Sequence, residues 1–294
     1  MLTKNQFEIL SALKCAKKPL SELELSEITK ISLEKVNDEL SYLSQYISDG
    51  VINNLGDTVL EPYKVNRAIL ICAGIGSRLV PITLNTPKAL IRVNGKRLID
   101  NSLDALLAAG INEIYIIRGY LGEQFDQLLY KYPMIKFIDN PIYDVTNNIS
   151  SILKANELVS NSYILEGDLL LYNPEIIKPY QYESNYIGMA INDKTNEWVM
   201  ETENNRVVNV TIGGESGYQL YGVSYWTKED GLRLASDIKE IIEEPGGKDL
   251  FFDMVPLFKR KADYKVYVRE YNFGDIIEID TFDELKQLDD SYNV

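Results

Sequence analysis

The sequence predicts an α/β protein in which a Rossmann-like, mostly parallel sheet is preceded by a small helical domain. From Arg67 onward, short apolar runs alternate with segments of helical periodicity, as in repeated β-α-β units. Residues 186–226 instead read as successive strands joined by polar turns, so we expect an antiparallel insertion that acts as a lid. Residues 1–64 contain three helical patterns, and we predict that they form a domain separate from residues 65–294.

Composition excludes several functional classes. The chain of 294 residues is 45% hydrophobic and 25% charged, as in an ordinary globular protein, and it has no run long enough to span a membrane. Because the N-terminus lacks a signal-peptide pattern, we expect a cytoplasmic protein. The absence of histidine excludes His-dependent catalysis and favours oxygen ligands for any metal. The net charge of −14 argues against a nucleic-acid coat or a membrane-surface binder.

The first domain is predicted to contain three helices and a hairpin. Residues 3–14 have apolar side chains at helical spacing, and Ser21 with Glu24 forms a capping-box pattern at the start of a second helix. Ser32 begins a third, amphipathic helix. The polar residues 54–57 lie between two short apolar segments and predict the turn of a hairpin. This arrangement resembles the winged helix-turn-helix domains of MarR-like regulators.

Such domains bind DNA through the third helix, and the charge of this helix disfavours that role. It carries Glu34, Asp38 and Glu39 against Lys35 alone, whereas a duplex reader needs cations that face the phosphates. We therefore expect a protein–protein or dimerisation role, with a homo-oligomer as one form of it, in preference to DNA binding.

The large domain begins with an apolar run, residues 68–73, that leads directly into a glycine-rich loop. Glycines there allow backbone N–H groups to approach an anion closely, and the cations Arg78 and Lys88 suit phosphate oxygens. Leu79 occupies the third glycine position of a dinucleotide fingerprint, and no Walker motif is present. We therefore predict a phosphate-binding loop for a nucleoside triphosphate.

The remaining elements follow in order. Helical patterns are predicted at 98–109, 121–130, 147–158 and 228–243, and strands at 113–118, 135–138, 162–166, 186–191, 198–201, 207–212, 219–226 and 275–280. A last helix begins at Thr281, which forms a capping-box pattern with Glu284. Gly119 and Asp168 follow strand ends, and ligands bind at the carboxyl ends of strands in such sheets. We expect both residues at the same rim as the glycine loop.

The segment AGIGSRLVPITLNTPKAL resembles the signature of the nucleotidyltransferases that activate sugar phosphates and phosphocholine. Further stretches are similar to the LicC-type CTP:phosphocholine cytidylyltransferases: INEIYIIRGYLGEQFDQL, TNNISSI, TNEW, GVSYW and IIEID. The resemblance covers about residues 67–290. It implies a GT-A-like nucleotidyltransferase fold and transfer of CMP from CTP to phosphocholine, with CDP-choline and pyrophosphate as products.

The resemblance also implies roles for individual residues. The loop would hold the triphosphate, and Lys88 would neutralise the α-phosphate. Gly119 with Tyr120, and Asn148 with Ser151, would contact base and ribose. The implied nucleotide-binding residues are Ala73, Gly74, Gly76, Ser77, Arg78, Lys88, Gly119, Tyr120, Asn148 and Ser151, with Lys88 and Arg78 catalytic. Asp168 and Asp280 match the aspartates that hold Mg²⁺. Where many members have an aspartate two positions before the first of these, this chain has Glu166.

The resemblance also implies a set of aromatic and acidic residues that would bind the acceptor, the molecule that receives CMP. A quaternary ammonium is recognised by aromatic faces, helped by a carboxylate. The candidates are Glu197, Trp198, Trp226, Phe252 and Asp253, and relatives often have Tyr-Trp-Asp where this chain has Phe-Phe-Asp. Other small zwitterions, namely 2-aminoethylphosphonate and phosphoethanolamine, are alternative acceptors, and a sugar 1-phosphate is a third. A transcription regulator with a ligand-sensing transferase fold is the alternative from another class.

The chemistry is consistent with the composition. A phosphate monoester has a second pKa near ~6, so at neutral pH it is already a nucleophile and needs no general base. The reaction then requires in-line positioning, a divalent cation and protein cations at the α-phosphorus.

Overall fold

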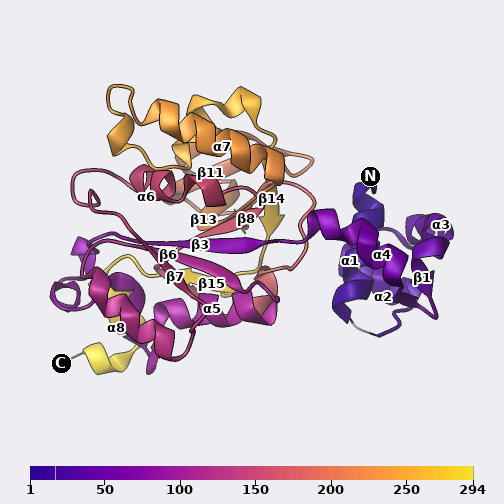
Figure 1. Cartoon of the computed structure of the whole chain (residues 1–294), viewed down its shortest axis with the longest axis horizontal. Helices are drawn as coiled ribbons and strands as arrows, with labels where there is room; N and C mark the ends of the chain where they lie inside the picture. Colours follow the sequence, from indigo (N-terminus) through magenta and orange to yellow (C-terminus); the bar gives the residue numbers. More distant parts are fainter. Residues whose placement is uncertain (17, 294) are drawn as a thin grey trace. The chain divides into compact units, whose positions relative to one another are not determined.

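The computed structural model describes residues 1–16 and 18–293, which form two compact units (Figure 1). The first unit consists of Met1–Lys64 together with Tyr180–Tyr182, and the second consists of the rest of the described chain.

Three helices form most of the first unit. They are α1 (Lys4–Ala16), α2 (Glu22–Thr29) and α3 (Leu33–Leu43). The predicted capping box is confirmed, because the Ser21 side chain accepts from the Glu24 backbone N–H while the Glu24 side chain accepts from the Ser21 N–H. Ser32 precedes α3 but makes no capping hydrogen bond through its side chain. Apolar side chains of the helices, among them Phe7, Leu10 and Val36, build a separate core.

The predicted position of the hairpin is wrong. The two strands are β1 (Ile47–Ser48) and β2 (Val51–Ile52), and the segment predicted as a turn lies in helix α4 (Asn54–Leu60). The reason is local: the Asn53 side chain accepts from the backbone N–H groups of Leu55 and Gly56, which is an N-cap. The resemblance to winged helix-turn-helix domains stays a prediction.

A short segment from the middle of the chain completes the first unit, and the sequence analysis did not predict it. The ring of Tyr182 stacks on that of Tyr63 at 5.5 Å, and both rings contact Phe7. The Gln181 N–H donates to the Tyr63 carbonyl oxygen over 2.8 Å.

The second unit is built on a sheet whose parallel half matches the prediction. Strands β3 (Arg67–Cys72), β6 (Glu113–Arg118), β7 (Lys136–Asp139) and β8 (Ser162–Glu166) lie in the order β8-β3-β6-β7 and are parallel. Helices α6 (Ile149–Lys154) and α7 (Lys228–Ile241) lie on one face, and α5 (Leu98–Ala108) and α8 (Phe282–Leu288) lie on the other side (Figure 1). Two large apolar clusters fill the space on either side of the sheet.

The antiparallel insertion is present, but it closes into a small barrel that was not predicted. Its strands are β10 (Asn185–Ile191), β11 (Thr195–Glu203), β12 (Arg206–Gly214) and β13 (Gly217–Trp226), joined by β14 (Tyr267–Glu270). Strand β10 pairs with both β13 and β14, which closes the ring of five strands. Strand β13 also pairs with β8 and so connects the barrel to the parallel sheet.

Short elements complete the second unit. Strand β9 (Leu169–Leu171) pairs with β15 (Ile276–Glu278), and β4 (Arg92–Val93) pairs with β5 (Lys96–Arg97). Of these strands, the sequence analysis predicted only β15. The segment predicted as a helix at 121–130 is a 3₁₀ helix, Gly122–Tyr130. The helix predicted at 147–158 is α6 followed by a 3₁₀ turn, Asn156–Leu158.

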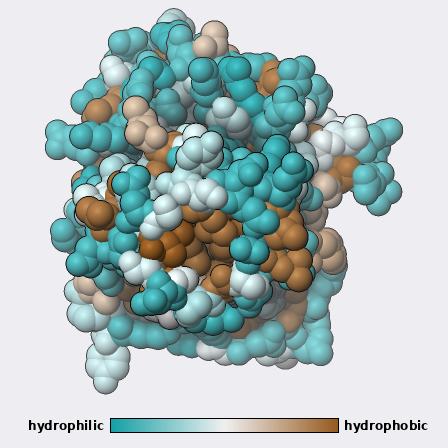
Figure 2. Space-filling model, turned by 90° about the vertical axis from the view of Figure 1, so that its right-hand side faces the viewer, coloured by the Kyte–Doolittle hydropathy of each residue, from teal (hydrophilic) through white to brown (hydrophobic). Residues whose placement is uncertain are grey.

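Two surface properties follow from this arrangement. Within the described residues, no helix combines the length and the apolar character that crossing a membrane requires. Figure 2 shows a face on which hydrophobic residues gather in a hollow surrounded by hydrophilic ones. Large apolar side chains of the first unit that are more than half exposed are Met1, Leu23, Ile28, Tyr42 and Leu55.

Candidate active site

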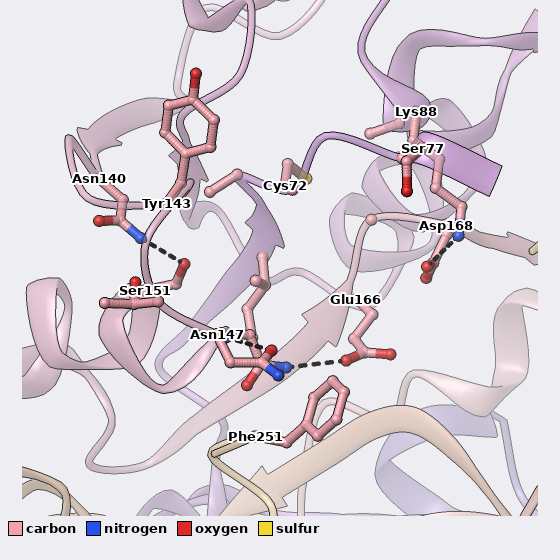
Figure 3. Close-up of a pocket in the computed structure, with 18 of the residues that line it drawn as sticks. Cys72, Ser77, Lys88, Asn140, Tyr143, Asn147, Ser151, Glu166, Asp168 and Phe251 are labelled. Atoms are coloured by element: carbon pink, nitrogen blue, oxygen red, sulfur yellow. Dashed lines mark hydrogen bonds and ion pairs between the residues drawn. The ribbon is translucent and has the colours of Figure 1, made fainter. Parts of the chain in front are cut away.

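A cavity of about 320 Å³ lies at the carboxyl ends of β3 and β8, as predicted for ligands of a parallel sheet (Figure 3). It is lined by the loop after β3, the turn after β8 and the segment that leads into α6. Most of the predicted nucleotide and metal residues line it: Ala73, Gly74, Gly76, Ser77, Arg78, Lys88, Asn148, Ser151, Asp168 and Asp280. The fold therefore brings together residues that lie more than 200 positions apart.

The glycine loop has the geometry that its composition indicates. Gly76 is left-handed, with φ of 68°, and a Cβ atom there would lie 3.1 Å from the Thr83 side chain and 3.2 Å from that of Lys88. The Thr83 hydroxyl donates to the Gly76 carbonyl oxygen over 2.9 Å. Glycine at this position allows the loop to pass close to the segment that carries Lys88.

Gly119 and Tyr120 support the loop and do not line the cavity. The Tyr120 N–H donates to the Ala73 carbonyl oxygen over 3.1 Å, and its hydroxyl donates to the Leu84 carbonyl oxygen over 3.3 Å. A Cβ atom on Gly119 would lie 2.6 Å from the ring of Tyr143. Because Tyr143 lines the cavity, Gly119 determines how closely that ring can approach the loop.

The cations and carboxylates of the site form one network. Lys88 Nζ lies 2.7 Å from Asp168 Oδ2 and 3.0 Å from Asp280 Oδ1, and Arg78 Nη2 lies 2.7 Å from the same Asp280 oxygen. Burial by itself would lower the pKa of Lys88, but the charges of Asp168 and Asp280 outweigh it and raise that pKa. Lys88 is therefore a firmly charged ammonium at the centre of the cavity.

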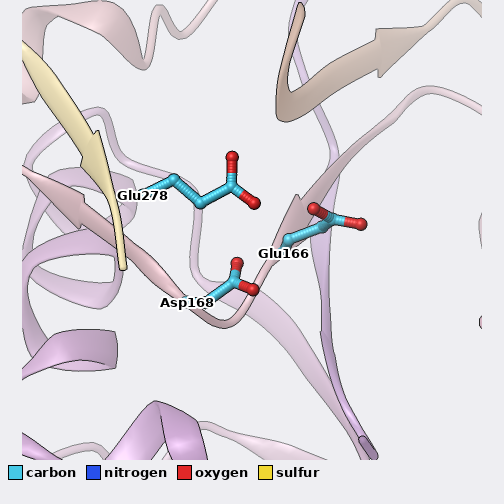
Figure 4. A group of neighbouring side chains, drawn as sticks. All are labelled: Glu166, Asp168 and Glu278. Atoms are coloured by element: carbon cyan, nitrogen blue, oxygen red, sulfur yellow. The ribbon is translucent and has the colours of Figure 1, made fainter. Parts of the chain in front are cut away.

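Three carboxylates form a group that could hold a metal ion (Figure 4). They belong to Glu166 at the end of β8, Asp168 in the following turn and Glu278 of β15, and each offers an oxygen within 4.8 Å of the others. Asp168 Oδ1 is buried and has no hydrogen-bond partner among residues 1–16 and 18–293. Oxygen donors of this kind suit a hard divalent cation. Asp280 lies outside this group and accepts from the two cations instead.

The electrostatics of the group also favour a cation. Burial, and then the charge of Asp168, raises the pKa of Glu278 to about 8. Burial and the surrounding carboxylates raise the pKa of Glu166 well above its ordinary value. Burial and mutual repulsion therefore disfavour ionisation of these carboxyls together, and a divalent cation would offset that repulsion.

Glu166 and Glu278 were not among the predicted site residues, although the sequence contains a signal for both. Each lies two positions before a predicted metal aspartate, in EGD and in EID. Two residues of chain span at most about 7 Å, so each glutamate is held close to an aspartate that lines the cavity.

Asparagines before α6 join the cavity to the segment that follows α7. Asn148 Nδ2 donates to Glu166 Oε1 over 3.3 Å, and Asn148 Oδ1 accepts from the Phe252 N–H over 2.8 Å. The buried Asn140 donates to Ser151 Oγ over 3.1 Å. The sequence analysis did not predict Asn140, Asn147, Thr146, Tyr143 or Phe251 as lining residues.

The predicted acceptor residues separate into two groups. Glu197 is exposed and Trp198 half-buried, and the Trp198 ring lies edge-to-face with Phe251 at 6.0 Å. Trp226 and Phe252 are core residues, with 0% and 2% of their surface exposed. Trp226 packs on Tyr186 and donates to Ser224 Oγ. We therefore correct their placement: Phe251, and not Phe252, lines the cavity.

Asp253 is buried beside this site and accepts a hydrogen bond from the Tyr186 hydroxyl over 2.6 Å. Burial raises the pKa of Asp253 to about 7, from an ordinary value of 3.8. In the unfolded chain the group ionises at the lower pH, so its contribution to stability is present at acidic pH and is lost as pH rises towards 7.

The variant Asp253→Asn should therefore flatten the pH dependence of stability. We expect the wild-type melting temperature to fall between about pH 4 and about pH 7, and the fall to be several degrees smaller in the variant. Thermal denaturation at several pH values across this range measures the melting temperatures of both proteins. The exposed Asp249→Asn variant is the control, and an equal fall in wild type and Asp253→Asn would contradict the assignment.

Comparisons with known proteins agree with this geometry. Residues 67–174 match the nucleotidyl transferase family. The chain is 34% identical to a 2-aminoethylphosphonate cytidylyltransferase of Lancefieldella rimae, over 77% of this chain and 93% of that protein. It is 35% identical to a choline-phosphate cytidylyltransferase of Streptococcus pneumoniae, over 76% and 97%. The solved structure of the pneumococcal CTP:phosphocholine cytidylyltransferase superposes with a TM-score of 0.72 at 34% identity, over 76% and 98%.

Proposed function

Because the chain belongs to the nucleotidyltransferase family, we propose that it transfers CMP from CTP to a small phosphate or phosphonate with a cationic nitrogen. The products are a CDP-linked or CMP-linked zwitterion and pyrophosphate. One observation carries this proposal: the glycine loop, two cations and a cluster of carboxylates line a single cavity that also contains the aromatic ring of Phe251. The alternative of a ligand-sensing regulator does not require that arrangement.

The nucleotide half of the proposed mechanism rests on the loop. Backbone N–H groups of residues 74–77 and the Arg78 guanidinium would bind the β- and γ-phosphates. Lys88 would contact the α-phosphate and stabilise the charge that develops on its oxygens as the acceptor attacks in line. The acceptor oxygen is already anionic at neutral pH, so no side chain has to remove a proton.

Carboxylates on the opposite wall would hold Mg²⁺. The family pattern assigns this role to Asp168 and Asp280, and the distances favour Asp168 with Glu166 and Glu278. When bound, the ion neutralises triphosphate oxygens and so lowers the barrier to attack at the α-phosphorus. In this arrangement Lys88 exchanges its contact with the aspartates for one with phosphate.

The acceptor half combines aromatic and acidic side chains. Trp198 and Phe251 offer ring surface for a quaternary ammonium, which favours phosphocholine. Carboxylates such as Glu197 offer acceptors for the N–H groups of a primary ammonium, which favours 2-aminoethylphosphonate. A relative of each kind is similar to this chain to the same degree. Phosphocholine is our first candidate and 2-aminoethylphosphonate the second.

A pyrophosphate-release assay tests the proposal. The purified protein is incubated with Mg²⁺, each of the four nucleoside triphosphates, and phosphocholine, 2-aminoethylphosphonate, phosphoethanolamine or a sugar 1-phosphate. We expect CTP to be preferred and one of the zwitterions to give the highest kcat/KM. No release with CTP and any zwitterion, together with release with a sugar 1-phosphate, would show that the acceptor assignment is wrong.

The variant Trp198→Ala tests the acceptor half. Loss of one aromatic face should raise the KM of the zwitterion about tenfold or more, because a cation–π contact contributes about 1–2 kcal/mol when desolvated. The KM of CTP should change much less, and Trp198→Phe should recover part of the loss. Steady-state kinetics with each substrate varied in turn measures both values, and equal effects on the two KM values would count against the aromatic contact.

For the first unit we propose contact with protein. The charged side chains of its α2 and α3 helices are mainly acidic, and apolar side chains such as Leu23 and Ile28 are exposed on it. Acidic and apolar surface suits a protein partner or a second copy better than DNA phosphates. Sedimentation analysis of the full chain, and a DNA-binding assay at low salt, distinguish the two.

A further inference from the structure

A second hollow of the transferase unit is lined by basic residues and lies outside the site described above. It has a volume of about 660 Å³ and lies between the start of β12 and the helical turns at 255–263. Four of its nine lining residues are cations, Arg206, Lys259, Arg260 and Lys261, and one is a carboxylate, Asp263. A local excess of positive charge is notable in a chain of net charge −14.

Most of this positive charge is available to a ligand. Within residues 1–16 and 18–293, Arg206 and Lys259 take part in no ion pair. Lys261 Nζ makes only a long contact, 3.5 Å, with Asn209 Oδ1. Arg260 Nη2 lies 3.7 Å from carboxylate oxygens of Glu240 and Glu244, too far for a hydrogen bond. Cations grouped in this way attract anions and suit phosphate oxygens.

The rest of the lining is apolar. Val207, Val208, Phe258 and Ala262 contribute it, and Phe258 keeps 38% of its surface exposed. Apolar side chains would contribute little to the binding of a bare inorganic ion, whereas they could bury a hydrocarbon or ring attached to one. The two kinds of surface together fit an anion that carries an apolar group.

We propose that this hollow binds an organic phosphate ester, with the phosphate on the cations and the organic group against Phe258. The cations Arg206 and Lys259 reach it from different segments, and both are exposed. This site is independent of cytidylyl transfer, so its existence does not depend on which acceptor the enzyme uses.

A row of aromatic rings connects this hollow to the catalytic cavity. The Phe258 ring packs edge-to-face on Trp198 at 5.3 Å, and Trp198 packs on Phe251 at 6.0 Å. Phe251 lines the catalytic cavity. A ligand held against Phe258 therefore packs on the ring that contacts Trp198, which we assign to the acceptor, and its binding should change the KM of the acceptor.

Calorimetric titration of the full chain tests the site, with phenyl phosphate as the organic ester and pyrophosphate as the inorganic ion. The titrations are made in the Lys88→Ala variant, in which the catalytic cavity has lost its central cation. We expect one equivalent of phenyl phosphate to bind, at least about fivefold more tightly than pyrophosphate because of the buried ring. Adding Arg206→Ala and Lys259→Ala should weaken binding by about tenfold or more.

The control is Lys265→Ala in the same background, which removes one exposed charge that does not line the hollow. Unchanged binding after loss of Arg206 and Lys259, or an equal effect of Lys265→Ala, would overturn the proposed site. Equal affinity for phenyl phosphate and pyrophosphate would overturn the proposal that the ligand is an organic ester. A further test keeps Lys88 and combines Arg206→Ala with Lys259→Ala. When no ester is added, kcat of this double variant should equal that of wild type. Adding phenyl phosphate should no longer change the KM of its acceptor.

Discussion

Replacing Lys88 with alanine is expected to lower kcat at least about 100-fold, the loss seen when a preorganised group that stabilises transition-state charge is removed. The physical reason is its position. Its ammonium is the one side-chain cation that contacts both Asp168 and Asp280 among the described residues, and only 15% of its side chain is exposed. A buried cation at this point can offset charge at the α-phosphorus with little screening by water.

Steady-state kinetics with saturating CTP and acceptor measures this effect. Lys96→Ala is a matched control, because that half-exposed lysine pairs with Asp104 and does not line the cavity. We also expect a lower melting temperature in Lys88→Ala without divalent cation, since its carboxylate partners lose their counter-charge. A kcat close to that of wild type would remove Lys88 from the mechanism.

The second large effect is expected for Asp168→Asn, which keeps the shape of the side chain and removes its charge. We expect kcat to fall at least about 100-fold. Asp168 is central to the site because one oxygen accepts from Lys88 and the other is buried without a hydrogen-bond partner in the described chain. Its side chain also belongs to the group of three carboxylates. An unpaired buried oxygen next to two further carboxylates is suited to a cation ligand.

A binding measurement separates a metal ligand from a merely structural carboxylate. In wild type, Mg²⁺ or Mn²⁺ should raise the melting temperature, and this rise should be absent in Asp168→Asn. Glu278→Gln and Asp280→Asn distinguish the two possible sets of metal ligands. A smaller metal-dependent rise of the melting temperature in Glu278→Gln favours the carboxylate group of the structure. A smaller rise in Asp280→Asn favours the ligands of the family pattern. A full metal-dependent rise in Asp168→Asn would contradict its assignment.

The sequence predicted the parallel half of the sheet closely because its signal is local. Strands β6 and β8 have the predicted bounds, and Thr281 caps α8 as expected. A six-residue apolar run or a capping pattern depends on neighbours within one turn or strand, so it can be recognised without the fold. The glycine loop was recognisable for the same reason, because Gly74, Gly76 and the nearby cations are close in sequence.

Errors arose where tertiary packing decides the outcome. Trp226 and Phe252 appear in an aromatic and acidic pattern, yet both are buried in the core, because a side chain's surroundings depend on which element packs against it. The closure of five strands into a barrel requires β14, which lies more than 40 residues beyond β13. Pairings between distant strands leave no local signal in the sequence.

By itself, the sequence determined the class of fold, the glycine-rich loop that we predict to bind phosphate, and the absence of histidine chemistry, since each depends on residue types and short spacings. Only the tertiary structure decided that Lys88 contacts Asp168 and Asp280, that Glu166 and Glu278 join Asp168, and that Phe251 replaces Phe252 at the cavity. The contacts of Lys88 with Asp168 and Asp280 join segments separated by 80 and 192 residues. Their geometry is set by the packing of the sheet and not by any one segment.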